Sequence, residues 1–129
     1  MKESVSAVFV TNELVYFIKR QNYLSVFPGY YATPGGKVDK DESDVYPDFC
    51  QKFSPLKKFT PQVLNALVRE VREELNFDLE TELRNGRVLS IDYIGLAITP
   101  EFNPYRFKNY YFKITLNGKI DFAFDAQEV

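Results

Sequence analysis

The chain has 129 residues, of which 45% are hydrophobic, so it is long enough for one domain with a buried core. Its formal net charge of −2 argues against a nucleic-acid or membrane surface held by bulk electrostatics, but leaves small anionic substrates open. It contains no histidine, which excludes histidine-based triads, histidine general bases and most zinc sites.

The first half of the chain predicts short strands joined by turns. Val5–Val10 is a largely buried strand, and Leu14–Ile18 follows it after a short turn, so the two predict a hairpin. Residues 21–34 are irregular. The Gly-rich run at 33–38, T-P-G-G-K-V, predicts a turn that enters a short strand, whereas residues 39–59 show no clean period.

A helix is predicted next. Thr60 is a good N-cap, Pro61 suits the first helical position, and Asn76 is an acceptable left-handed residue at the C-terminal end. Apolar residues repeat between them at helical spacing and predict a face toward the core: Val63, Leu64, Leu67, Val68, Val71 and Leu75.

The second half predicts strands again. Val88–Ile98 is one bent strand or two short ones around Gly95, and Tyr105–Leu116 contains another strand after a loop. Asn117-Gly118 is a strong hairpin dipeptide, and Ile120–Phe124 is the last predicted strand. The order of strands and helix predicts a mixed sheet with a helix on one face, an α/β or α+β layered fold.

Three glutamates of the predicted helix lie on one face, directly behind Arg69. They are Glu70, Glu73 and Glu74, and residues at i, i+3 and i+4 are neighbours on a helix surface. Like charges at this spacing destabilise an isolated helix. Hard anionic oxygens are, however, the ligands that Mg²⁺ and Mn²⁺ prefer, so the pattern predicts a divalent-metal site.

Two segments together resemble the Nudix box, G-x5-E-x7-R-E-U-x-E-E-x-G-U, in which U is a bulky apolar residue. The first runs from Gly36 to Glu42 and the second from Arg69 to Phe77. The T-P-G-G-K-V lead-in and the strand-turn-strand beginning are also similar to this family. The resemblance implies a Nudix-type α/β/α sandwich with a mixed sheet, in a single domain over residues 1–129.

The chain departs from the family pattern at two places. Twenty-six residues rather than seven separate Glu42 from Arg69, an insertion of 19 residues that we place at 43–61. Some Nudix branches, including those that act on coenzyme A derivatives, carry insertions here. Two interpretations of the insertion stay open: it is a lid or substrate wall, or it is an irregular subdomain that covers the sheet edge or makes a dimer contact. The late glycine is Asn76, which also tolerates positive φ.

The resemblance implies a metal-dependent hydrolase in which water attacks phosphorus and cleaves a diphosphate bond of a nucleoside-diphosphate-linked or coenzyme-A-like substrate. The alternative is a catalytically silent Nudix-fold module that binds a nucleotide or cofactor. The implied ligands of Mg²⁺ or Mn²⁺ are Glu70, Glu73, Glu74 and the backbone carbonyl of Gly35. Arg69 is expected to pair with the glutamates and orient them, and Glu42 to anchor the loop to the helix.

Without histidine, a carboxylate or a metal-bound hydroxide must act as the general base. Glu70 is the choice inside the box. The distal choices are Glu128, which we place first, Glu101 and Asp125. Candidates for contacts to the substrate phosphates or base flank the expected cleft: Lys19, Arg20, Tyr30, Tyr31 and Lys37.

The sequence also bears on partners and location. Nudix domains usually continue into a further strand and helix, and we expect the C-terminal helix to be absent here. An apolar sheet face left uncovered would favour association, so we expect a homodimer. The single cysteine, Cys50, cannot form an internal disulfide, and the first residues lack a signal-peptide layout, so a cytoplasmic location is expected. No apolar run is long enough to span a membrane.

Overall fold

The structure is a computed structural model that describes residues 2–12, 14–19, 31–98 and 106–120. At 18–19 and 31–32 it describes the backbone alone. Within these ranges, no helix is long and apolar enough to cross a membrane.

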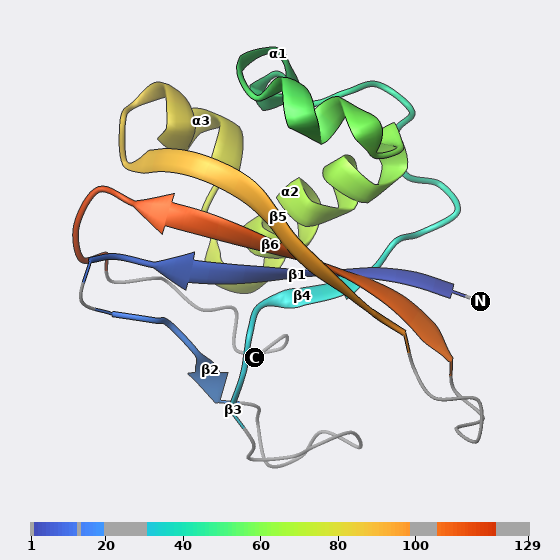
Figure 1. The fold of residues 1–129 in the computed structure, drawn as a ribbon, viewed down its shortest axis with the longest axis horizontal. Helices are drawn as coiled ribbons and strands as arrows, with labels where there is room; N and C mark the ends of the chain where they lie inside the picture. The colour runs from blue at the N-terminus through green and yellow to red at the C-terminus, as the bar shows by residue number, and fades with distance from the viewer. Residues whose placement is uncertain (1, 13, 20–30, 99–105, 121–129) are drawn as a thin grey trace.

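A mixed four-stranded sheet forms the centre of the fold (Figure 1), as predicted. Its strands, in the order β4-β1-β6-β5, are β4 (Gly35–Lys37), β1 (Lys2–Val10), β6 (Phe107–Leu116) and β5 (Val88–Ile98). β1 and β6 run parallel, whereas β4 and β5 pair antiparallel with their neighbours. A separate two-stranded sheet joins β2 (Ile18–Lys19) to β3 (Tyr31–Ala32).

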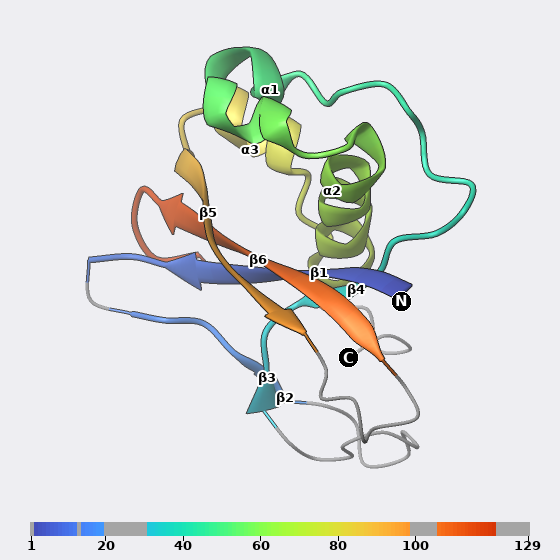
Figure 2. The same ribbon diagram turned by 45° about the vertical axis from the view of Figure 1, so that its right-hand side comes forward.

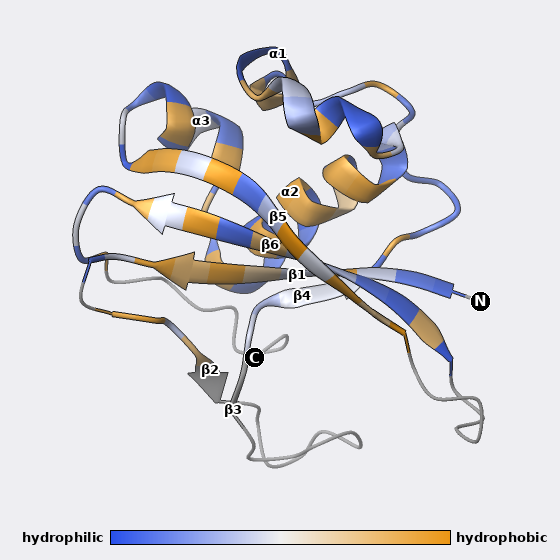
Figure 3. Ribbon diagram, viewed as in Figure 1, coloured by the Kyte–Doolittle hydropathy of each residue, from blue (hydrophilic) through white to orange (hydrophobic). Residues whose placement is uncertain are grey.

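One face of the central sheet is apolar because side chains alternate along a strand. Val5, Ala7 and Phe9 of β1 are buried, as are Phe112 and Ile114 of β6, and the register places Ala7 beside Phe112 and Phe9 beside Ile114. Figure 3 shows apolar and polar bands alternating along β5 and β6. This face packs on the helices and forms the core.

The long helix α2 (Pro61–Leu75) crosses behind the sheet in the view of Figure 1 and contacts β1 and β4. Its ends are as predicted. The Thr60 hydroxyl accepts a hydrogen bond from the Val63 backbone N–H, and Asn76 takes the left-handed conformation with φ 52°. All of the predicted core-face residues are buried, together with Ala66.

The predicted second strand, Leu14–Ile18, is wrong for most of its length. The turn before it is present, and Val15 bridges Val10, but the chain then leaves β1. Val15 and Phe17 are 54% and 57% exposed, and only Tyr16 between them packs against the core, so little burial holds this segment in the sheet. Its last residue pairs with β3 instead, inside a stretch that we predicted to be irregular.

Three short helical segments were not predicted: α1 (Phe49–Lys52), η1 (Ser54–Lys58) and α3 (Leu79–Arg84). None is long enough to show a helical period, which needs about three turns of sequence. Local signals do exist, because Asp78 caps α3 through its side chain and Pro55 lies in the first turn of η1. Figure 2 shows α1 and α3 gathered on the side of the sheet where β5 lies.

β5 is one strand, bent by two register irregularities, between Val88 and Ser90 and between Tyr93 and Gly95. Gly118, with φ 107°, makes the turn predicted after β6. Of the predicted strand Ile120–Phe124, only Ile120 is among the described residues. The expected absence of a C-terminal helix also concerns residues outside them and stays a prediction.

The second face of the sheet carries a polar cluster between β1 and β6, so it is not uniformly apolar. The Ser4 hydroxyl donates to Asn109 Oδ1 at 2.9 Å, and Asn109 Nδ2 donates to Ser6 Oγ at 3.0 Å. Val8 and Val10 of β1 lie on the same face, and the homodimer stays a prediction.

Candidate functional site

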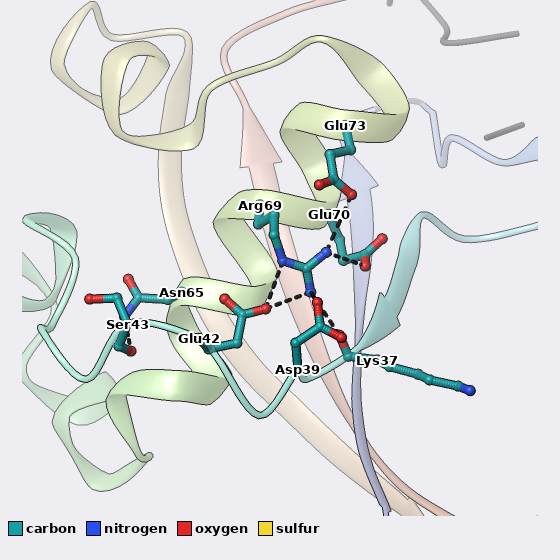
Figure 4. Close-up of polar contacts among 8 residues, drawn as sticks. All are labelled: Lys37, Asp39, Glu42, Ser43, Asn65, Arg69, Glu70 and Glu73. Carbon is teal, nitrogen blue, oxygen red and sulfur yellow. Dashed lines mark hydrogen bonds and ion pairs between the residues drawn. The ribbon is translucent and has the colours of Figure 1, made fainter. Parts of the chain in front are cut away.

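The loop after β4 lies against the C-terminal half of α2, so the two segments that carry the sequence motif meet in space (Figure 4). Arg69 is at the centre of this contact. Its Nε donates to Glu42 Oε1 at 2.6 Å, and its second terminal nitrogen donates to the Lys37 carbonyl at 2.8 Å. The 26 residues that separate Glu42 from Arg69 in sequence therefore do not separate them in the fold.

Arg69 also binds two of the three glutamates. One guanidinium nitrogen is 2.7 Å from Glu70 Oε1 and 3.3 Å from Glu73 Oε2. Asp39 adds a fourth carboxylate at 3.4 Å. A planar guanidinium has five N–H donors, and only such a group can bond three carboxylates and a carbonyl at once.

Three members of this cluster are largely withdrawn from water, whereas the side chains of Glu73 and Asp39 are 45% and 62% exposed. The side chain of Glu42 is 6% exposed, that of Glu70 12% and that of Arg69 21%. Burial lowers the pKa of Arg69, but its hydrogen bonds to Glu42 and Glu70 and the charges of both carboxylates outweigh burial and raise the pKa above its ordinary value. Arg69 is thus a permanent cation that fixes the loop and the helix to each other.

The two glycines of β4 allow the carboxylates to approach the backbone. A Cβ on Gly36 would lie 2.4 Å from Glu70 Cδ, and a Cβ on Gly35 would lie 2.1 Å from the Val5 carbonyl oxygen. The Gly35 N–H points to Glu74 Oε2 at 3.4 Å. Close packing, rather than positive φ, therefore requires glycine here.

Solved structures share this fold over nearly the whole chain. A NUDIX hydrolase from Alicyclobacillus acidocaldarius matches 99% of the chain with a TM-score of 0.69 at 16% identity. The dihydroneopterin triphosphate pyrophosphohydrolase of E. coli matches 95% with a TM-score of 0.59 at 17% identity. The NUDIX domain of Shewanella oneidensis NrtR, complexed with ADP ribose, matches 91% with a TM-score of 0.55 at 14% identity.

The chain has the Nudix fold. It spans 75%, 73% and 61% of the lengths of these three proteins, in the same order. No family model and no curated protein matches the sequence. The structural likeness therefore establishes the fold, and the activity has to be argued from the site.

The described side chains do not converge on a metal position in this arrangement. In the part of the chain that the structure describes, no three histidine, cysteine, aspartate or glutamate side chains are grouped closely enough to hold an ion. Glu70 and Glu73 turn to Arg69 instead, whereas Glu74, 7% exposed, turns to Gly35. The donor chemistry nevertheless fits Mg²⁺ or Mn²⁺, because buried carboxylates are typically paired or coordinate a metal.

The predicted substrate contacts fall in different places. The Lys37 carbonyl belongs to the Arg69 cluster, but its ammonium lies 5.6 Å from the centre of the Phe107 ring and points away from Arg69 in Figure 4. Lys19 and Tyr31 are register partners in the β2–β3 sheet. Arg20 and Tyr30 lie outside the described residues, as do the distal general-base candidates Glu101, Asp125 and Glu128.

The sequence analysis missed two residues of the contact between α2 and the loop after β4. Asp39 joins the Arg69 cluster, and no periodic signal marks a single acid in a loop. Asn65 lies one turn before Arg69, and its Nδ2 is 2.6 Å from both the Ser43 and the Val45 carbonyl oxygens. The sequence did carry a signal for the Asn65 contact, because Asn65 is a polar residue on the same helix face as Arg69.

The insertion packs into the core. Phe49, Cys50 and Leu56 are buried, and the Phe59 ring lies 4.7 Å from that of Tyr93 and 5.4 Å from that of Phe112. Its last two positions, 60 and 61, cap and begin α2. These contacts favour our structural interpretation, a subdomain that covers the sheet, over a lid above the glutamates.

Proposed function

We propose that this chain is a Nudix-type pyrophosphohydrolase that cleaves the diphosphate of a nucleoside-diphosphate-linked or coenzyme-A-like substrate with the help of Mg²⁺ or Mn²⁺. The observation that carries the proposal is the Arg69 cluster. Arg69 joins Glu42, Glu70 and Glu73 although the insertion divides the motif. Arg69, Glu42 and Glu70 are largely buried although buried charges cost desolvation, and this supports a functional role for the cluster.

In this proposal, the chain's own residues position the divalent ion and the carboxylates around it. Glu70, Glu73, Glu74 and the Gly35 carbonyl would hold the divalent ion, which when bound neutralises charge on a diphosphate and lowers the pKa of water. Arg69 orients Glu70 and Glu73, and the close approach of Gly36 sets the depth of the Glu70 carboxylate. Glu70 is also a candidate to accept the proton of the attacking water, as is Glu128.

A cleavage screen tests the proposal. The purified chain is incubated with a panel of diphosphates (coenzyme A and its acyl forms, ADP-ribose, NADH, dinucleoside polyphosphates) with and without about 5 mM Mg²⁺ or Mn²⁺, which suits weak oxygen-ligand sites. We expect metal-dependent cleavage that Glu74→Gln abolishes. Asp44→Asn, which removes the same charge from an exposed loop residue, is the matched control and should retain turnover. Full activity in Glu74→Gln would contradict the assigned role.

A second candidate is a silent module that binds a nucleotide. Two observations favour it: the carboxylates face Arg69 and Gly35 rather than one another, and the matched NrtR domain is complexed with ADP ribose. Calorimetry with ADP-ribose and Mg²⁺ separates the two candidates. Binding without product over hours would favour the module, and product formation would exclude it.

A further inference from the structure

The segment of residues 42–46 runs along one side of α2, from the C-terminal half of the helix toward its beginning. Arg69 donates to Glu42 at the start of this segment, and Asn65, one turn earlier on the same helix face, makes the next contacts. Figure 4 shows Asn65 and Arg69 on α2, both turned toward the segment. The segment belongs to neither a helix nor a strand, so its backbone groups have no ladder partners and depend on bonds from elsewhere.

The side-chain amide of Asn65 binds two carbonyls of this segment at once. Its Nδ2 lies 2.6 Å from the Ser43 carbonyl oxygen and 2.6 Å from the Val45 carbonyl oxygen. Both partners are acceptors, so the amide nitrogen, with its two N–H donors, is the atom that lies between them. Leucine has a similar branched shape without donors, and aspartate has acceptors in their place. Asparagine is therefore required by its hydrogen bonds rather than by its shape.

Tyr46 fixes the other end of the segment. Its hydroxyl lies 2.9 Å from the Phe59 carbonyl oxygen and 3.2 Å from the Lys57 carbonyl oxygen. Phe59 directly precedes Thr60, the N-cap of α2. The hydroxyl of Tyr46 therefore joins the two ends of residues 47–58, so that this part of the insertion leaves the segment and returns to α2 at nearly the same place.

The dimensions of the segment and the helix agree. From Thr60 to Arg69 an α-helix rises about 13.5 Å, at 1.5 Å per residue. The four residue steps from Glu42 to Tyr46 can span about 13 Å of chain. The segment therefore extends from the Arg69 cluster to the beginning of α2, and Asn65 holds it near its middle.

We propose that Asn65 is a positioning residue for the candidate active site. It ties the segment to α2 and so keeps the Glu42 carboxylate on Arg69, although 26 residues separate these two in sequence. The side chain of Glu42 is 6% exposed, so a lifted segment would open a buried ion pair to water. Arg69 would then redistribute its donors, and Glu70 and Glu73 would lose their orientation. The effect on Glu70 and Glu73 rests on the proposed function, whereas the hold on Glu42 does not.

The first measurement follows the Arg69 Nε–H by NMR, because this proton is bonded to Glu42 in the folded chain. We expect its exchange with water to be about tenfold faster in Asn65→Leu and in Asn65→Asp, which is the effect of losing about one net hydrogen bond. The rate should stay constant in low urea, because local opening exposes little surface. A rate that rises with urea would assign the effect to global unfolding and overturn the proposal. The same two substitutions at Asn85, exposed at the end of α3, are the matched controls and should leave the rate unchanged.

Turnover of the diphosphate that the cleavage screen identifies tests the consequence for the reaction. We expect kcat to fall about tenfold in both Asn65 variants while KM stays within about twofold, because the segment controls the orientation of the carboxylates rather than substrate binding. Tyr46→Phe removes only the hydroxyl and should lower kcat in the same direction by a smaller factor. Tyr93→Phe is its matched control, since Tyr93 is 40% exposed and Tyr46 42%, and it should turn over as the unchanged chain does.

Three further outcomes would overturn the proposal. An unchanged exchange rate in Asn65→Leu would show that Glu42 stays on Arg69 without the Asn65 bonds. An effect of Asn65→Asp alone would assign it to the added charge one turn from Arg69, rather than to the lost bonds. Faster exchange with unchanged kcat would limit Asn65 to a structural role. If no diphosphate is cleaved, the proposed function fails, whereas the exchange rates still decide whether Asn65 keeps Glu42 on Arg69.

Discussion

The Glu70 carboxylate packs directly on the backbone of Gly36, so that a Cβ at position 36 would lie 2.4 Å from Glu70 Cδ. Gly36→Ala must therefore push the carboxylate out of its position beside Arg69. Because the displaced group is the end of a flexible side chain, the fold can adapt. We expect kcat for the proposed hydrolysis to fall on the order of 100-fold, the size of effect that misplacement of a catalytic group produces, with little change in Tm.

Gly95→Ala is the control for that substitution. A Cβ on Gly95 would meet nothing within 4 Å, and this glycine does not have positive φ. Turnover and Tm should both stay near their original values. If the two alanine variants lost activity equally, the Gly36–Glu70 contact would not be the cause.

Gly35→Ala should act on stability instead. Its Cβ would lie 2.1 Å from the Val5 carbonyl oxygen, and 2.9 Å from Ser6 Cα, both of which belong to the backbone of β1. Backbone cannot rotate away as a side chain can, so the β4–β1 pair must separate. We expect a loss of about 3 kcal/mol in the free energy of unfolding, the upper end of typical overpacking costs, measured by urea titration. An unchanged urea midpoint would show that β1 yields more easily than the packing implies.

Sequence alone predicted the part of the fold in which pattern and burial agree. α2 has an N-cap, an N-terminal proline, a helical apolar stripe and a left-handed C-terminal residue, and each gives the same boundaries. β6 lies in the interior of the sheet and β5 lies next to it at the edge, and both have long apolar segments. The segment Leu14–Ile18 is equally apolar but was misassigned, because composition does not reveal that Val15 and Phe17 are more than half exposed.

The site was predictable in its residues and less so in its contacts. Helical spacing placed Glu70, Glu73 and Glu74 together, but it could not show that Arg69 holds two of them while Glu74 turns to Gly35. That division depends on the distance between β4 and α2, which is a tertiary quantity. The insertion was beyond sequence reasoning for the same reason, since α1 and η1 are short segments stabilised by the core that they cover.

Cys50 gives a prediction about alkaline pH. Burial, together with the charge of the neighbouring Glu80 and against the opposing charge of Lys57, raises the pKa of the Cys50 thiol to about 11. The unfolded chain loses this proton near its ordinary value of about 8.5, whereas the folded chain retains it. The stability that the protonated thiol provides is thus complete at neutral pH and is lost as the pH rises through about 9 to 11.

The urea midpoint of the unchanged chain should therefore fall over that interval, and Cys50→Ala should show a shallower fall from a lower starting value. The lower start reflects the small cavity left by the sulfur. Alkylation by iodoacetamide at pH 8 should be slow in the folded chain and fast in urea, because the thiolate is the reactive form. Parallel pH curves for the two chains would show that another group causes the alkaline loss.

Arg69→Lys tests whether geometry or charge holds the loop to the helix. Lysine keeps the positive charge but has no fork that reaches Glu42, Glu70 and the Lys37 carbonyl together. Glu42, 6% exposed, would then lose part of its hydrogen bonding in a buried place. We expect a loss of about 2 kcal/mol in the free energy of unfolding, from a buried charge that is incompletely paired, and a fall in kcat on the order of 100-fold, because Glu70 and Glu73 lose their orientation.

Arg84→Lys is the matched substitution at an exposed ion pair. Arg84 is 70% exposed and lies 3.8 Å from Asp48, itself 75% exposed, so its replacement should change stability by well under about 1 kcal/mol. Urea titration and turnover of both variants are measured side by side. If Arg69→Lys behaved like Arg84→Lys, charge alone would suffice to join the two halves of the motif, and the guanidinium contacts would have no role in positioning Glu70.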